Sequence, residues 1–96
     1  MTKLHTDQIE KLFRAVCSLE SIDECFDFFE DLCTVKEIQD MSQRFETAIL
    51  LREGKSYSEV AAEVGVSSAT ICRVNKCLNY GTGGYEKIIK KLEELK

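Results

Sequence analysis

The sequence predicts an all-α protein with six helices, and three observations support this fold class. Apolar residues recur at intervals of three and four, serine or threonine caps open the successive segments, and no segment shows the sustained alternation of a β-strand. The chain has 96 residues, of which 44% are hydrophobic and 31% charged, and it contains no proline. These values predict one globular helical domain over residues 1–96 and exclude collagen-like and low-complexity chains.

Residues 1–54 are predicted to form dimerisation helices. The first helix spans about Thr6 to Leu19, and Ser21 opens the second, with Glu24 placed to complete a capping box. The second helix is apolar over more of its surface than one small core can bury, which favours contact with a second subunit over a simple core helix. Its apolar residues are Ile22, Cys25, Phe26, Phe28, Phe29 and Leu32.

The third helix is predicted to be the longest. Thr34 and Glu37 open it with a second capping box, and it continues until Gly54, a typical helix stop. Its apolar face contains Ile38, Met41, Phe45, Ala48, Ile49 and Leu50.

Residues 56–78 have the organisation of a helix-turn-helix. Ser56 and Glu59 begin a short helix that ends at Val64, Gly65 suits the left-handed conformation of a tight turn, and Ser67 caps a helix that reaches Leu78. Ala61 is small where the two helices cross. The residues expected to fill the angle between the helices are Val60, Val64, Val66, Ile71 and Val74.

The outer face of this motif is suited to double-stranded DNA. Arg73 can bind guanine or the DNA backbone, Ala69 can contact a thymine methyl group, and serine and threonine hydroxyls can contact phosphates or bases. Between Arg73 and Lys91 five basic residues oppose one acidic residue. The predicted DNA-binding residues are Ser56, Ser67, Ser68, Ala69, Thr70, Cys72, Arg73 and Lys76.

The last segment, residues 85–96, is predicted to be helical from about Glu86 to Leu95, after a loop over residues 79–85. Its apolar residues are expected to point inward: Ile88, Ile89, Leu92 and Leu95.

The net charge of −4 argues against a nucleic-acid partner for the chain as a whole. The two halves differ, however, because residues 1–54 contain six basic and twelve acidic residues and residues 55–96 contain seven and five. The sequence therefore leaves two functions open: a DNA-binding regulator, and a helical protein-interaction module that lacks specific DNA binding.

Other function classes have little support in the sequence. One histidine, His5, and five cysteines without a C-x-x-C pair predict no metal site, no cofactor and no enzyme. The cysteines are expected to be reduced and mostly buried. The chain contains no signal-peptide pattern and no apolar run long enough to cross a membrane, so a cytoplasmic protein is expected.

From Leu32 to Leu78 the chain resembles the Trp-repressor family. The stretches FFEDLCTVKEI and CLNYGTGGY resemble the YerC/YecD-type branch of Trp-repressor-related proteins. The resemblance implies an intertwined helical homodimer whose N-terminal helices form the subunit interface. It also implies a bacterial transcription repressor that reads a palindromic operator.

The resemblance also implies a pocket for a small effector, formed by Thr34, Arg44, Thr70 and Arg73. Two arginines could bind a carboxylate, and the hydroxyls could orient an ammonium group. Val74 replaces the glycine against which the family packs the indole ring, and its two methyl groups disfavour tryptophan as the effector. The alternative is that Thr34 is only an N-cap and Arg44 only a partner of a neighbouring acidic residue.

Overall fold

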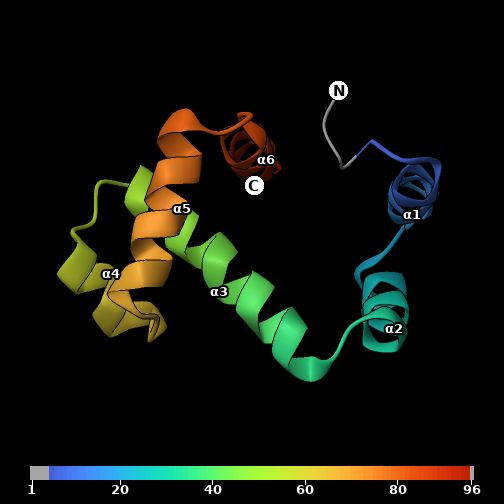
Figure 1. The fold of residues 1–96 in the computed structure, drawn as a ribbon, viewed down its shortest axis with the longest axis horizontal. Coiled ribbons are helices and arrows are strands. Elements are labelled where there is room, and N and C mark those ends of the chain that lie inside the picture. The colour runs from blue at the N-terminus through green and yellow to red at the C-terminus, as the bar shows by residue number, and fades with distance from the viewer. Residues whose placement is uncertain (1–4, 96) are drawn as a thin grey trace. The chain divides into compact units, whose positions relative to one another are not determined.

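The computed structural model describes residues 5–95, and its six helices confirm the predicted all-α class (Figure 1). The helices are α1 (Asp7–Cys17), α2 (Ile22–Leu32), α3 (Val35–Arg52), α4 (Tyr57–Val64), α5 (Ser68–Tyr80) and α6 (Gly84–Glu94). They form two compact units, of which the first ends at Val35 and the second begins at Lys36. The first unit contains α1 and α2, and the second contains α4 to α6 and all but the first residue of α3.

The start of α2 differs in one hydrogen bond from its prediction. The Ser21 hydroxyl accepts a hydrogen bond from the Glu24 N–H (3.1 Å), but the Glu24 carboxylate accepts from the Glu20 N–H (3.0 Å) and not from Ser21. Ser21 has φ −150°, against −74° at Ser56, where a complete capping box forms. The more extended backbone rotates the Ser21 N–H away from the carboxylate, so the predicted box is wrong in its second half.

Large apolar side chains of the first unit are exposed. No residue of α1 or α2 is buried, and the exposed fractions are 57% for Phe13, 75% for Ile22 and 59% for Phe26. The rings of Phe28 and Phe29 meet edge to face, with centroids 5.6 Å apart. The surplus of apolar surface that the sequence predicts for the second helix is therefore present in the structure.

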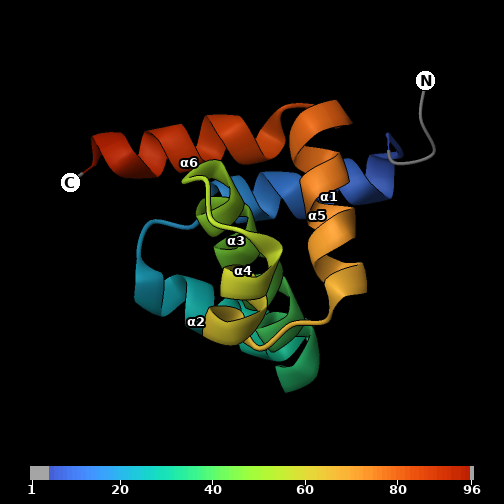
Figure 2. The same ribbon diagram turned by 90° about the vertical axis from the view of Figure 1, so that its left-hand side faces the viewer.

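The core of the second unit is built around α3, and α5 lies beside it in both views (Figure 1 and Figure 2). One buried cluster joins α3 to α5 and α6, and another joins α3 to α4 and α5. The buried apolar members are Ala48, Val74 and Ile89 in the first cluster and Leu50, Val60 and Ile71 in the second.

Arg52, the last residue of α3, binds two carboxylates of α6. Its Nε and Nη2 donate to Glu86 (2.8 and 2.9 Å), and its Nη1 donates to Glu93 (2.9 Å). The Arg52 guanidinium holds the pKa of Glu86 below its usual range, and the two carboxylates raise the pKa of Arg52. The side chain of Arg52 is 25% exposed. These contacts attach both the first and the last turn of α6 to the end of α3.

The connection between α5 and α6 is shorter than predicted. α5 continues through Tyr80, and α6 begins at Gly84, so the predicted loop over residues 79–85 is wrong at both ends. The Asn79 Nδ2 donates to Asn75 Oδ1 (3.2 Å), a contact one helical turn apart that stabilises the last turn of α5. Gly83 starts α6 with φ +87°, a conformation that glycine adopts without strain.

The predicted inner face of α6 is wrong for most of its residues. Ile89 is buried, but Ile88 is 50%, Leu92 43% and Leu95 82% exposed. These three side chains follow one another at intervals of four and three and form one stripe of the helix. Only the face with Ile89 meets the core of the second unit.

The prediction of mostly buried cysteines is also wrong. Cys17, Cys72 and Cys77 are exposed, and Cys25 and Cys33 are partly buried. Cys72 and Cys77 lie on the surface of α5 because its buried positions are filled by Ile71 and Val74, and the other three belong to the first unit, where α1 and α2 bury no residue. Among residues 5–95, no helix is long and apolar enough to cross a membrane.

Candidate nucleic-acid interface

In the helix-turn-helix of the second unit, α4 and α5 begin at the capping residues that the sequence predicts. At Ser56 the capping box is complete, because the Ser56 hydroxyl accepts from the Glu59 N–H (3.2 Å) and the Glu59 carboxylate accepts from the Ser56 N–H (2.9 Å). This second bond holds the pKa of Glu59 below its usual range. Gly65 ends α4 with φ +82°, as the tight turn requires.

Ser67 begins α5. Its hydroxyl accepts a hydrogen bond from the Thr70 N–H (3.2 Å) and donates to Thr70 Oγ1 (3.1 Å). The hydroxyls of Ser56 and Ser67 are therefore engaged in capping their own helices. Ser68 lies one residue beyond the cap and is exposed.

The inner side of the motif is packed as predicted. α4 lies against α5, and Val60, Ile71 and Val74 are each at most 1% exposed. Ala61, Val64 and Val66 are partly buried around the cluster that contains Val60 and Ile71. The inner positions of α5 are thus filled by the motif's own residues and by α3, which fixes the face that α5 turns outward.

The outward face of α5 is polar and exposed. It contains five of the predicted DNA-binding residues, and the half-buried Thr70 lies at its edge. The exposed residues are Ser68, Ala69, Cys72, Arg73 and Lys76. In a helix-turn-helix, this is the face of the second helix that can enter a major groove.

Two residues of the predicted effector pocket line one hollow. Arg44 of α3 and Arg73 of α5 both border a hollow of about 430 Å³, together with Val74 and with Tyr85 of α6. Val74 is only 1% exposed and belongs to the core, and it also lines this hollow. The hollow combines two guanidinium groups with an otherwise largely apolar wall.

The two predicted threonines do not line this hollow. Thr70 borders a second hollow of about 330 Å³, which Arg44 also borders. Thr34 precedes α3 and is not among the residues that line either hollow. The structure of residues 36–95 therefore places Arg44 with Arg73 in one hollow and with Thr70 in the other.

The second hollow includes side chains that the sequence analysis did not single out, among them Lys36, Asp40 and Gln43. With Arg44 these residues occupy positions i, i+4, i+7 and i+8 of one helix, which places them on one face of α3. This spacing was visible in the sequence, but nothing in it shows that the turn before α5 lies opposite that face.

Comparison with known proteins identifies the family of this fold. A family model described as Trp repressor protein matches residues 7–93, which is nearly the whole chain. The chain belongs to the Trp repressor family. The resemblance over Leu32 to Leu78 is thereby confirmed and extends through α1, α2 and α6.

Several proteins are similar to this chain in sequence or in structure. It is 46% identical over 92 residues to the uncharacterized protein YerC of Bacillus subtilis (strain 168), covering 96% of this chain and 88% of YerC. A TrpR-like protein from Eubacterium eligens ATCC 27750 superimposes with a TM-score of 0.92 at 50% identity, covering 95% of this chain and 94% of that one. A candidate Trp repressor from Staphylococcus aureus gives a TM-score of 0.92 at 41% identity, covering 95% and 91%.

Proposed function

We propose that the protein is a dimeric, sequence-specific DNA-binding transcription repressor without catalytic activity. One observation carries this proposal: the buried side of α5 is fully packed by Ile71 and Val74, while Arg73, Lys76 and Ser68 remain exposed on its outer face. Membership of the Trp repressor family supports the same function.

The proposed mechanism is steric. Each subunit inserts α5 into a major groove, and the two helices reach successive grooves about 34 Å apart on a palindromic operator. Arg73 contacts a guanine or a phosphate, and Lys76 contacts the backbone. The bound dimer then excludes the polymerase from the promoter.

The proposed dimer accounts for the exposed apolar surface of the first unit. Phe13, Ile22 and Phe26 are each more than half exposed in the single chain. Large apolar side chains that are this exposed favour an interface with a second copy of the chain.

A small effector is part of the proposal, and the hollow between Arg44 and Arg73 supports it. Two guanidinium groups beside an apolar wall suit an anionic ligand such as a small carboxylate. Val74 narrows this hollow, which disfavours tryptophan. Thr34 and Thr70 stay predictions as effector contacts.

The alternative function, a protein-interaction module, is favoured by a different surface. α1 and α2 contain seven acidic side chains against two basic ones and also expose Phe13 and Phe26. Such a surface could bind a basic amphipathic partner, with the helix-turn-helix not used for DNA.

Selection of binding sites from a random duplex pool tests the two functions. We expect the wild type to select a palindromic site and Arg73→Ala to lose its base preference. In Lys76→Ala, the plot of log affinity against log salt concentration should have a slope that is shallower by about one. Lys11→Ala, on the acidic helix α1, is the matched control and should bind as the wild type does. If neither α5 variant changes binding, α5 does not enter the groove; if no duplex binds even at low salt, the interaction module is the better proposal.

A further inference from the structure

We propose that the hollow between the start of α3 and the turn before α5 binds a backbone phosphate of the DNA, with Lys36 and Gln43 as its additional contacts. This inference rests on the proposed DNA-binding function. It adds to the predicted interface two residues that lie outside the helix-turn-helix. It also gives Arg44 a DNA contact in addition to its place in the effector hollow.

The hollow has a volume of about 330 Å³ and two walls. Lys36, Asp40, Gln43 and Arg44 of α3 form one wall, and the turn from Gly65 to Ser67 with Thr70 forms the other. The lining side chains carry mainly hydrogen-bond donors: the Lys36 ammonium, the Arg44 guanidinium, the Gln43 amide and the Thr70 hydroxyl. Such a set matches the oxygens of a phosphate.

The balance of charge in the hollow favours an anion. Lys36 and Arg44 oppose one carboxylate, Asp40, which lies 3.0 Å from the Lys36 Nζ. This ion pair is exposed, with 82% of the Lys36 side chain and 46% of Asp40 accessible, and exposed pairs of this spacing contribute little stability. The Lys36 ammonium can therefore leave Asp40 and bind a phosphate with little loss of stability.

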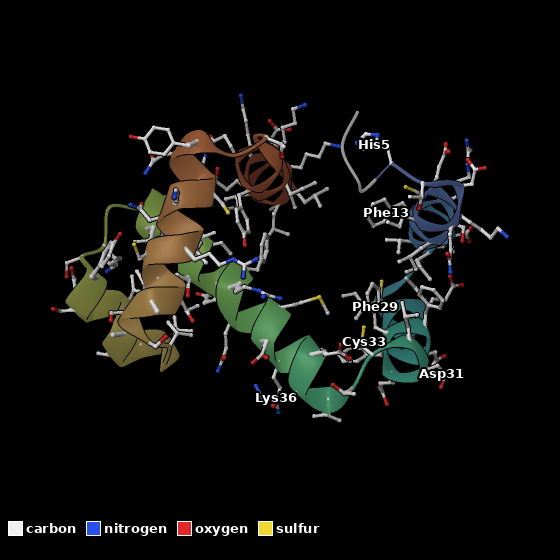
Figure 3. The ribbon with its side chains drawn as sticks, viewed as in Figure 1. His5, Phe13, Phe29, Asp31, Cys33 and Lys36 are labelled. Carbon is white, nitrogen blue, oxygen red and sulfur yellow. The ribbon has the colours of Figure 1, made fainter. Side chains whose placement is uncertain are left out.

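The position of the hollow points to DNA. It adjoins the N-terminal end of α5, the end that contacts base edges when such a helix lies in a major groove. The major groove is about 12 Å wide and has a sugar-phosphate backbone on each side. Basic side chains beside this end of the helix therefore lie next to one of the two backbones. The starts of α3 and α5 lie at the same end of the second unit in both views, and Lys36 projects outward from the first turn of α3 (Figure 1, Figure 2 and Figure 3).

The affinity for a fluorescein-labelled duplex of mixed sequence, measured over a series of salt concentrations, tests this site. We expect Lys36→Gln to weaken binding several-fold at low salt and to make the logarithmic salt slope shallower by about one. We expect Asp40→Asn to strengthen binding, because it removes the one opposing carboxylate and releases Lys36. Lys11→Gln removes the same charge from α1 and should leave the slope unchanged.

The outcomes separate this inference from the function on which it rests. If the wild type binds no duplex, the DNA-binding function fails. If the wild type binds and Lys76→Ala lowers the slope while Lys36→Gln does not, the phosphate site alone is overturned. A second comparison uses sodium phosphate and sodium chloride at equal ionic strength. If phosphate raises the melting temperature of the wild type but not of Lys36→Gln, and both proteins bind duplex equally well, the hollow binds free phosphate and not DNA. The phosphate site on DNA is then also overturned.

Discussion

Thr47 of α3 carries a polar group where the rest of the core is apolar. The side chain is fully buried, and its Oγ1 has no hydrogen-bond partner among residues 5–95. A buried hydroxyl that has lost its water and gained no partner lowers the free energy of unfolding. Thr47 therefore weakens the core in which it lies.

Replacement of the hydroxyl by a methyl group should stabilise the protein. Thr47→Val keeps the branched shape and removes the unpaired oxygen, so we expect the free energy of unfolding to rise by about 1 kcal/mol, measured by denaturant titration. Thr47→Ala is the control, because it removes the hydroxyl but leaves a cavity and should not stabilise. A lower stability of the valine variant would show that the hydroxyl has a partner in solution.

Gly65 permits the turn of the helix-turn-helix through its backbone conformation alone. At φ +82° a β-carbon would meet no atom within 4 Å, so the cost of substitution is conformational and not steric. We expect Gly65→Ala to lower the free energy of unfolding by about 1 kcal/mol. Gly65→Asn should lose less, because asparagine tolerates this region. Equal losses in the two variants, measured by thermal unfolding, would contradict this explanation.

At the scale of the helices, the attachment of α6 to α3 depends on ionised carboxylates. Because the pKa of Glu86 lies below its usual value of 4.5 in the folded protein, the unfolded chain binds the proton more readily. The stabilising effect of this contact is therefore complete above the usual pKa and disappears as the pH falls through the lowered pKa.

Removal of this contact should change the acid sensitivity of α6. We expect Glu86→Gln to lower stability at neutral pH and to make stability less dependent on pH below the usual pKa. Hydrogen exchange should become faster at the amides of α6 and not at those of α4. Glu94→Gln, on the same helix, is the control. An unchanged pH dependence in Glu86→Gln would mean that the ion pair does not hold α6.

The helices themselves were largely predictable because their boundaries are local. The caps at Ser56 and Ser67 and the turn at Gly65 depend on residues within four positions of each other. The end of α5 was not predicted. The glycines after Tyr80 indicated a loop that begins at Asn79, whereas the hydrogen bond from Asn79 to Asn75 keeps this residue in the helix.

The contacts between helices were less predictable than the helices. Arg52 meets partners 34 and 41 residues away, and no short-range pattern marks them. In α6, helical spacing identifies an apolar stripe at Ile88 and Leu92 but not whether another helix covers it. In the candidate site, the exposed face of α5 followed from its buried face, whereas the hollow at Lys36 depends on how α3 packs against the turn.

At the scale of the whole molecule, the buried core is small and unevenly distributed. Among residues 5–95, the buried apolar side chains all lie between Ala48 and Ile89, and α1 and α2 contribute none. A helix pair without a buried side chain gains little from folding by itself. In the proposed dimer, the folding of α1 and α2 is therefore coupled to association.

This coupling makes stability depend on protein concentration. We expect the melting temperature to rise with concentration, and Phe26→Glu to shift the protein from dimer to monomer in sedimentation equilibrium. Glu30→Gln, a polar change one turn further along α2, should leave the dimer intact. A wild-type protein that sediments as a monomer at all concentrations would contradict the proposed assembly.

Arg52 also determines how α6 is rotated about its own axis. Glu86 and Glu93 are seven residues apart, which is about two helical turns and roughly 10 Å along the axis, so both carboxylates lie on one side of α6. A helix attached at one point can pivot, whereas attachment at two points along one side also fixes its rotation. Tyr85 lies next to Glu86 and forms a wall of the hollow beside Arg73. Arg52, at the far end of α3, therefore helps to hold one wall of that hollow in place although it does not line the hollow itself.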